Sequence, residues 1–251
     1  MPDVPEHLRA LHGDVVVHDD ADAIAAACAE LLAGASADAC ASRGRFDVAL
    51  SGGSTPVATF DRLAGAPYRD SIEWPVWAVY FSDERAVPAD HAESNYRLVR
   101  EHLLTRVPID PDRVRRMPAD AADLDVAADE YAVTLHGDLP PGPAGPAGAP
   151  RLDCIVLGLG TNGHTASLFP GTPALNVVDR WVTRGRADHA PFDRLTLTYP
   201  TINAAALVVF LVSGAGKSAA LRATAAGATP AADVMPADGR LLWLLDSAAA
   251  G

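Results

Sequence analysis

The stretch LGLGTNGHTASLFPG, Leu157–Gly171, carries the strongest structural signal in this chain. It continues an apolar run, Leu152–Leu157, that has the composition of a buried strand. Glycines then crowd into positions 158–163, and glycine lets a backbone turn sharply and approach a ligand closely. His164 follows the last of them. Because open α/β sheets bind ligands at the carboxyl ends of their strands, this order of residues predicts an α/β fold with a site beside His164.

The same stretch matches the dinucleotide-binding pattern G-x-G-x-x-G, but the residues after its third glycine do not suit a nicotinamide cofactor. That pattern needs a crossover of roughly ten residues or more at this point. Pro170–Gly171 comes only seven residues after Gly163, although Asp179 stands where an acidic residue would be expected. We therefore reject NAD binding. The plain structural alternative is a glycine turn beside a hydrogen-bonded histidine.

The composition restricts the possible function classes. The chain has 251 residues, a formal net charge of −12 and a pI near 4.9, whereas nonspecific nucleic-acid binding needs a basic face. No apolar run reaches the roughly 18 residues of a membrane span, and the N-terminal residues lack a signal-peptide core. The cysteines, Cys28, Cys40 and Cys154, lack C-x-x-C spacing and are typical of buried thiols in a reducing compartment. We expect a cytoplasmic protein that binds neither nucleic acid nor membrane.

Strand and helix patterns alternate along the whole chain. Mainly apolar runs predict strands at Val15–Val17, Phe46–Leu50, Val76–Phe81, Leu152–Leu157, Leu207–Val212 and Leu241–Leu245. Two less apolar segments, Arg180–Arg186 and Arg194–Thr198, are further strand candidates. Helices are expected at 19–33, 57–63, 123–139 and 219–226, and one more after the cap Ser94. This alternation predicts an α/β fold with a mainly parallel, Rossmann-like sheet flanked by helices on both faces. Because it continues beyond the Pro/Gly-rich segment 140–150, we interpret that segment as a surface loop within a single domain, residues 1–251.

A second candidate site lies directly after the strand Phe46–Leu50, where the chain reads SGGSTP at 51–56 and then turns helical. Unpaired N–H groups at a helix N-terminus form an anion pocket. Gly52 and Gly53 let an anion approach, and Ser54 and Thr55 add hydroxyl donors. The segment therefore suits a phosphate group, and the alternative is an ordinary helix cap with a tight turn.

Two further strands end in polar clusters. Ser82–Arg85 ends one, and Ser213–Ser218 (SGAGKS) ends another. The second cluster is not a Walker A motif, because position 211 is leucine where glycine is required, so we reject NTP hydrolysis. In a parallel sheet such ends can converge on one rim, bringing an imidazole, acidic and cationic groups and two glycine loops together. That set suits a small phosphorylated substrate and acid–base chemistry.

Five motifs in order along the chain resemble the 6-phosphogluconolactonases, which share a superfamily with glucosamine-6-phosphate deaminase and ribose-5-phosphate isomerase. They are ALSGGSTP (49–56), FSDERAVP (81–88) with ESNY (93–96), the 157–171 stretch, RLTLTYP (194–200) and SGAGKSAAL (213–221). The resemblance implies hydrolysis of 6-phospho-D-glucono-1,5-lactone in the oxidative pentose phosphate pathway. It implies His164 as the catalytic base and Asp83 as an acidic residue beside the substrate. It also implies a phosphate cradle of Arg85, Arg194, Lys217 and the loop Gly52, Gly53, Ser54 and Thr55.

One position departs from the family pattern, which often reads Asp-Gly-His where this chain has Asn162, Gly163 and His164. An asparagine can still hydrogen-bond to the histidine, and we expect lactone hydrolysis to persist. Backbone N–H groups near Gly160–Gly163 are a candidate oxyanion site. We expect no cofactor and no metal, and a monomer or small homo-oligomer.

Two other functions stay open from the sequence. A sugar-phosphate isomerase or deaminase would need a second well-placed base, and Thr165–Gly171 contains no acid. A non-catalytic sugar-phosphate-binding protein would keep the same pocket without turnover.

Overall fold

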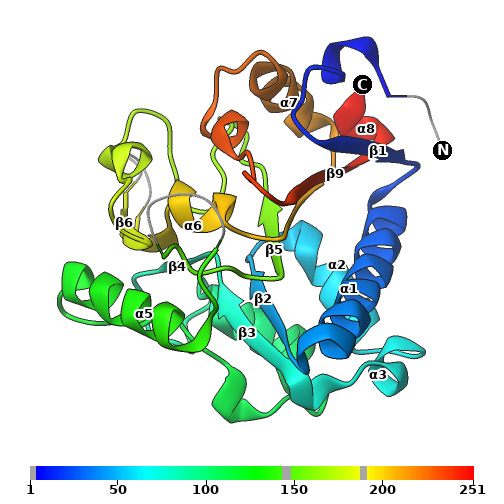
Figure 1. Cartoon of the computed structure of the whole chain (residues 1–251). Helices are drawn as coiled ribbons and strands as arrows, with labels where there is room; N and C mark the ends of the chain where they lie inside the picture. Colours follow the sequence, from blue (N-terminus) through cyan, green and yellow to red (C-terminus); the bar gives the residue numbers. More distant parts are fainter. Residues whose placement is uncertain (1–3, 143–147, 187–190) are drawn as a thin grey trace.

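The computed structural model describes residues 4–142, 148–186 and 191–251. Six parallel strands form its central sheet, in the order β1-β9-β8-β5-β2-β3 (Figure 1). Their bounds are β1 Asp14–His18, β2 Phe46–Leu50, β3 Trp77–Phe81, β5 Cys154–Gly158, β8 Leu207–Val212 and β9 Arg240–Asp246. Every residue of β2, β3 and β8 is buried, which explains why β3 and β8 read as continuous apolar runs rather than alternating ones. The one charged residue of β2, Asp47, is buried in an ion pair with Arg45. The predicted, mainly parallel α/β sheet is confirmed.

The strand order reverses between β2 and β5. From β2 the chain proceeds to β3 at one edge, whereas from β5 it proceeds through β8 and β9 towards the other edge. The loops after β2 and β5 therefore diverge at their carboxyl ends and leave a crevice between them. This is the point where open α/β sheets bind their ligands.

A second, antiparallel sheet was not predicted. It has the order β4-β7-β6, with β4 at Asp83–Arg85, β7 at Arg194–Leu197 and β6 at Val182–Gly185. The sequence predicts strands at two of these places but no separate sheet. It indicates only a polar strand end at β4, because three residues are too few to show a period. Since only Ser82 separates β3 from β4, the chain passes directly from one sheet into the other.

Helices cover the sheets, with α1 and α2 packed against each other and against the central sheet, and α5 packed on β6 and β7 (Figure 1). Their bounds are α1 Ala21–Arg43, α2 Ser54–Leu63, α3 Tyr68–Ser71, α4 Asn95–Val99, α5 Leu124–Asp138, α6 Tyr199–Asn203, α7 Ser218–Ala225 and α8 Ser247–Ala250. Ser94 caps α4 as predicted, its hydroxyl accepting the N–H of Arg97. Of the segment 140–150, residues 143–147 lie outside the described residues.

The long helix α1 is apolar enough by length and composition to cross a membrane. Its residues Ile24, Cys28 and Leu32 are fully buried and pack in the hydrophobic core. A core helix gives the same compositional signal as a membrane span, and here it covers the sheet.

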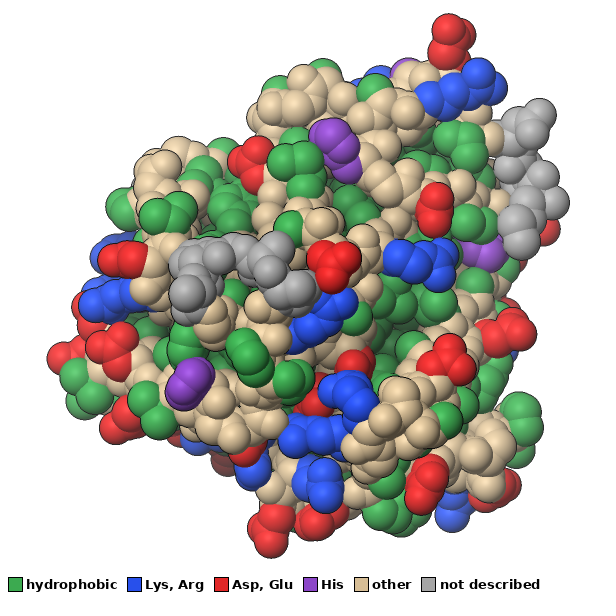
Figure 2. Space-filling view, in the orientation of Figure 1, with side chains coloured by type: hydrophobic (Ala, Val, Ile, Leu, Met, Phe, Trp, Pro, Cys, Tyr) green, Lys and Arg blue, Asp and Glu red, His purple; other side chains and the backbone are tan. Residues whose placement is uncertain are grey.

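The face in Figure 2 carries interspersed acidic and basic side chains. Cys28 and Cys154 are buried free thiols, whereas Cys40 is partly exposed.

Candidate active site

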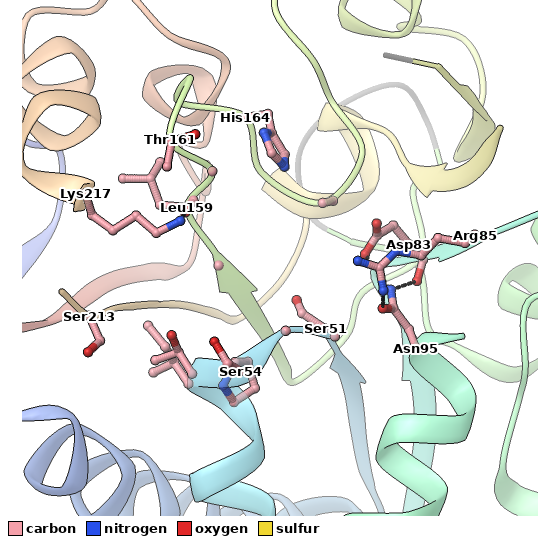
Figure 3. A pocket seen from close by; sticks show the side chains of 18 residues that line it. Ser51, Ser54, Asp83, Arg85, Asn95, Leu159, Thr161, His164, Ser213 and Lys217 are labelled. Carbon is pink, nitrogen blue, oxygen red and sulfur yellow. Dashed lines mark hydrogen bonds between the residues drawn. The ribbon is translucent and has the colours of Figure 1, made fainter. Parts of the chain in front are cut away.

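A cavity of about 380 Å³ opens at the carboxyl ends of β2 and β5, where the strand order reverses. Figure 3 shows side chains entering it from several directions. It is lined by Ser51, Gly52, Gly53, Ser54, Thr55, Pro56, Asp83, Arg85, Asn95, Gly158, Leu159, Gly160, Thr161, His164, Ala166, Leu211, Ser213 and Lys217. The four strand ends expected to converge on one rim do so.

The glycine loop after β2 leads into the N-terminus of α2 at the cavity wall. The helix begins at Ser54, so Ser54 and Thr55 belong to its first turn. Its N-cap, Gly53, has a φ of 107°, a conformation that favours glycine, and no side chain caps the first turn. A Cβ on Gly52 would lie 1.8 Å from Oδ1 of Asn95, so the close packing there requires glycine. The uncapped N–H groups of α2 suit an anion.

His164 lies half-buried in the cavity wall, and Asn162 determines which ring nitrogen is free. Oδ1 of Asn162 lies 3.2 Å from the backbone N of His164, whose N–H can only donate. That side-chain atom is therefore the amide oxygen and not the amide nitrogen. The same oxygen lies 2.5 Å from Nδ1 of His164, so Nδ1 carries the proton of the neutral ring. Nε2 keeps its lone pair, and the described residues offer it no hydrogen-bond partner.

Close neighbours fix the position of this ring. Gly160 packs so tightly on it that a Cβ there would lie 2.0 Å from Nδ1 of His164. The ring of Phe169 lies 4.5 Å away, centroid to centroid, at 41°. The hydroxyl of Thr165 donates to the carbonyl oxygen of Gly158 at 3.0 Å and ties the loop to β5. The histidine is thus held between its own loop and an aromatic side chain.

Burial lowers the pKa of His164 from 6.5 to about 4. The carboxylate of Asp83 opposes that shift, whereas the positive charges of Arg194, Lys217 and Arg85 add to it. His164 is therefore neutral near pH 7 and able to accept a proton at Nε2.

The backbone of the glycine loop is less available for oxyanion binding than the sequence suggested. The N–H of Gly160 donates to the carbonyl oxygen of His164 at 2.8 Å, and the N–H of Gly163 donates to that of Gly160 at 3.0 Å. The N–H groups of Thr161 and Asn162 have no partner among the described residues. The N–H groups of Gly160 and Gly163 are already used in the tight turn that positions His164.

Asp83 reaches the cavity from β4, but hydrogen bonds engage both of its oxygens. Oδ2 accepts from the hydroxyl of Ser167 at 2.6 Å, and Oδ1 accepts from Nδ2 of Asn95 at 3.2 Å and from the hydroxyl of Ser82 at 3.3 Å. The amide oxygen of Asn95 in turn accepts from Nη1 of Arg85 (Figure 3). The acidic residue is therefore part of a network rather than a free carboxylate.

Cationic side chains approach the cavity from two sides. Lys217, next to the start of α7, donates from Nζ to the carbonyl oxygen of Leu159 at 2.7 Å, and burial lowers its pKa. Arg85 lies on the opposite side in Figure 3. Arg194 pairs with Arg85 in the register of β4 and β7 but is not among the lining residues. Desolvation, followed by the charge of Arg85, lowers the pKa of Arg194.

Three predicted residues are not among those that line the cavity: Asn162, Gly163 and Arg194. Sequence reasoning assigned no role to Asn95 or Ser167, although both belong to the hydrogen-bond network of Asp83. The motif ESNY contained Asn95, but no spacing indicates a contact across twelve residues. Within the described ranges, no group of three or more His, Cys, Asp or Glu side chains could hold a metal ion.

The family profile of glucosamine-6-phosphate isomerases/6-phosphogluconolactonase matches residues 19–243 of this chain. Since the match spans most of the sequence, the chain belongs to this family. The family resemblance indicated by the five motifs is confirmed.

Individual relatives agree with this family. The probable chloroplastic 6-phosphogluconolactonase 4 of rice, Oryza sativa subsp. indica, is 37% identical over 246 residues, covering 94% of this chain and 75% of the relative. The probable 6-phosphogluconolactonase 1 of Arabidopsis thaliana is 33% identical, covering 94% and 92%. The solved 6-phosphogluconolactonase of Trypanosoma brucei is 30% identical, with a TM-score of 0.85 over 96% of this chain and 98% of that one. The fold and the prediction of an enzyme of this type are confirmed, whereas a cytoplasmic location stays a prediction.

Proposed function

We propose that this protein hydrolyses 6-phospho-D-glucono-1,5-lactone to 6-phosphogluconate, the second step of the oxidative pentose phosphate pathway, with His164 as general base. One arrangement carries this proposal. A single imidazole, neutral near pH 7 and unpartnered at Nε2 among the described residues, lines a cavity that also holds cationic side chains and a helix N-terminus. The first group suits proton transfer from water, and the others suit a phosphate monoester.

In the first half of the reaction, Nε2 of His164 takes a proton from water while the water oxygen adds to the lactone carbonyl carbon. The carbonyl π electrons move to its oxygen, and the imidazole becomes an imidazolium. Asn162 holds Nδ1 throughout, so the ring keeps its orientation. The phosphate, bound by Arg85, Lys217 and the α2 N-terminus, supplies binding energy remote from the reacting carbon and positions it.

In the second half, the tetrahedral intermediate collapses and the bond from C1 to the ring oxygen breaks. The imidazolium of His164 returns its proton from Nε2 to that ring oxygen, which becomes the C5 hydroxyl. The carboxylic acid formed at C1 loses its proton to solvent. Because burial and the nearby cations lower the pKa of His164 to about 4, its imidazolium is more acidic than an unperturbed one, which favours this return of the proton.

Lactone loss in the presence of the protein tests the proposal directly. The substrate is generated from glucose 6-phosphate and its dehydrogenase at slightly acid pH, where spontaneous opening is slow, and the δ-lactone signal is followed by NMR. We expect rapid loss with the wild type and none above the spontaneous rate with His164→Ala. His136→Ala is the matched control, because that histidine stacks on Trp181 outside the cavity. Turnover that survives His164→Ala would remove His164 as the base.

The alternative activity, isomerisation or deamination of a sugar phosphate, needs a carboxylate free to abstract a proton from carbon. Asp83 is the only Asp or Glu among the lining residues, and both its oxygens accept hydrogen bonds. This occupancy favours the lactonase. The wild type tests the alternative of a non-catalytic binding protein in the same assay. A wild type that binds 6-phosphogluconate without any turnover of the lactone would support that alternative.

A further inference from the structure

Ser167 lies three residues beyond His164, is fully buried and has no part in the proposed chemistry. Its hydroxyl donates to Oδ2 of Asp83 at 2.6 Å, a shorter contact than those of Asn95 and Ser82 with the same carboxylate. Its backbone N–H donates to the hydroxyl of Thr196 on β7 at 3.1 Å. Both bonds attach the histidine-bearing loop to the second sheet.

The turn that carries Ser167 is itself tightly constrained. Ala166, a lining residue, has a φ of 46°, in the left-handed region that costs a non-glycine residue about 1 kcal/mol or more. Leu168 closes the turn by donating its N–H to the carbonyl oxygen of Thr165 at 2.9 Å. A Cβ on Gly185 of β6 would lie 2.7 Å from the carbonyl oxygen of Ser167, so the strand backbone covers the turn closely. Surrounding contacts are therefore required to hold this backbone.

From Asp83 the hydrogen bonds continue to Asn95 and Arg85, which lie on the same side of the cavity as Asp83 (Figure 3). Nδ2 of Asn95 donates to the backbone oxygen of Asp83 at 2.8 Å and to its Oδ1 at 3.2 Å. Oδ1 of Asn95 accepts from Nη1 of Arg85. The carboxylate of Glu84 accepts the N–H of Asn95 at 2.7 Å and the hydroxyl of Ser94 at 3.0 Å, which fixes the start of α4. The donor and acceptor directions agree at every link.

We propose that Ser167 is a positioning residue that ties the loop of the base to the arginine of the phosphate cradle through Asp83 and Asn95. The assignment rests on the proposed function, in which the reacting carbon and the phosphate belong to one small molecule. The few bonds between them limit their separation, so the base and the cradle must be held within a matching range of distances. A continuous chain of hydrogen bonds between Ser167 and Arg85 meets that need, and it gives Asp83 a positioning role in place of proton transfer.

A double-mutant cycle on binding tests the tie without relying on turnover. Inorganic phosphate is titrated against the wild type, Ser167→Ala, Arg85→Ala and the double variant, with calorimetry as the readout. We expect Ser167→Ala to weaken phosphate binding by about tenfold in the wild-type background and by less than about twofold in the Arg85→Ala background. Equal effects in both backgrounds, or no effect in either, would overturn the tie. If phosphate binding shows the coupling but the wild type does not hydrolyse the lactone, the proposed function fails and the tie stands.

Turnover supplies the second readout. With the lactone, Ser167→Ala should lower kcat by about tenfold, because the ring of His164 is no longer held in position beside the lactone carbonyl carbon. Thr172→Ala is the matched control, since its hydroxyl donates to the backbone of Phe169 at 2.8 Å in the same loop without touching the network. Should Ser167→Ala fail to fold in thermal melting, Ser167→Cys preserves the volume with a weaker donor and should give a smaller coupling of the same sign. A cysteine variant that is folded and uncoupled contradicts the proposal.

Discussion

Replacing Asn162 with aspartate should raise the pKa of His164 and move the acid limb of the activity profile upward. In the wild type, Oδ1 of Asn162 lies 2.5 Å from Nδ1 and stabilises the neutral ring as an acceptor without charge. A carboxylate there can accept the same two N–H groups and adds a negative charge beside the imidazolium. The variant Asn162→Asp therefore favours the protonated form.

The structure sets the size of this effect. A unit charge about 4 Å from the imidazolium contributes ~1 kcal/mol in water and ~4 kcal/mol near a protein surface. Asn162 is exposed, which places the shift towards the lower end, at about 1–2 pKa units. Starting from a pKa of about 4, the histidine of the variant should titrate at about pH 5–6. Activity needs the neutral base, so it is lost as the pH falls through the histidine pKa, and the variant loses it at the higher pH.

The assay is kcat/KM for lactone loss between about pH 3.5 and 7, together with an NMR titration of the His164 ring in the same samples. Asn176→Asp is the control, because it adds the same charge at an exposed position away from the cavity. It should leave both curves unchanged. If Asn162→Asp leaves the acid limb and the ring titration where they are in the wild type, the assigned contact between Asn162 and Nδ1 is wrong.

Three other predictions rest on single contacts. Gly160→Ala places a Cβ 2.0 Å from Nδ1 of His164 and should lower kcat by about 100-fold, and stopped-flow rates close to the wild type would refute that packing. Lys217→Ala removes a cation from the cavity wall and should raise KM for the lactone by about tenfold or more. An unchanged KM in initial-rate kinetics would show that Lys217 does not bind the phosphate. Tyr131→Phe leaves the buried N–H of Phe81 without its acceptor and should lower the free energy of unfolding, measured in urea, by about 1–3 kcal/mol. An unchanged free energy of unfolding would contradict this prediction.

Much of the architecture was predictable because local patterns suffice for it. The bounds of the strand Phe46–Leu50 were predicted correctly, since this run is mainly apolar and lies between Arg45 and the Ser51-Gly52 turn. The helix after Asp19 was predicted too short: it continues to Arg43 and ends at Gly44 with φ 70°. The part that was missed, residues 34–43, is rich in alanine and shows no clear apolar stripe, so periodicity alone did not reveal it.

By itself, the sequence determined the α/β class, the four strand ends that line the cavity and the imidazole among them. Each of those features is a local property of the chain: an apolar run, a glycine turn, a polar cluster. Only the tertiary structure decided that β2 and β5 flank the reversal of strand order, that β4 joins a separate antiparallel sheet, and that Ser167 meets Asp83 across 84 positions of sequence. These contacts depend on how strands pair and loops pack, and partners distant in the chain leave no periodic trace in the order of residues.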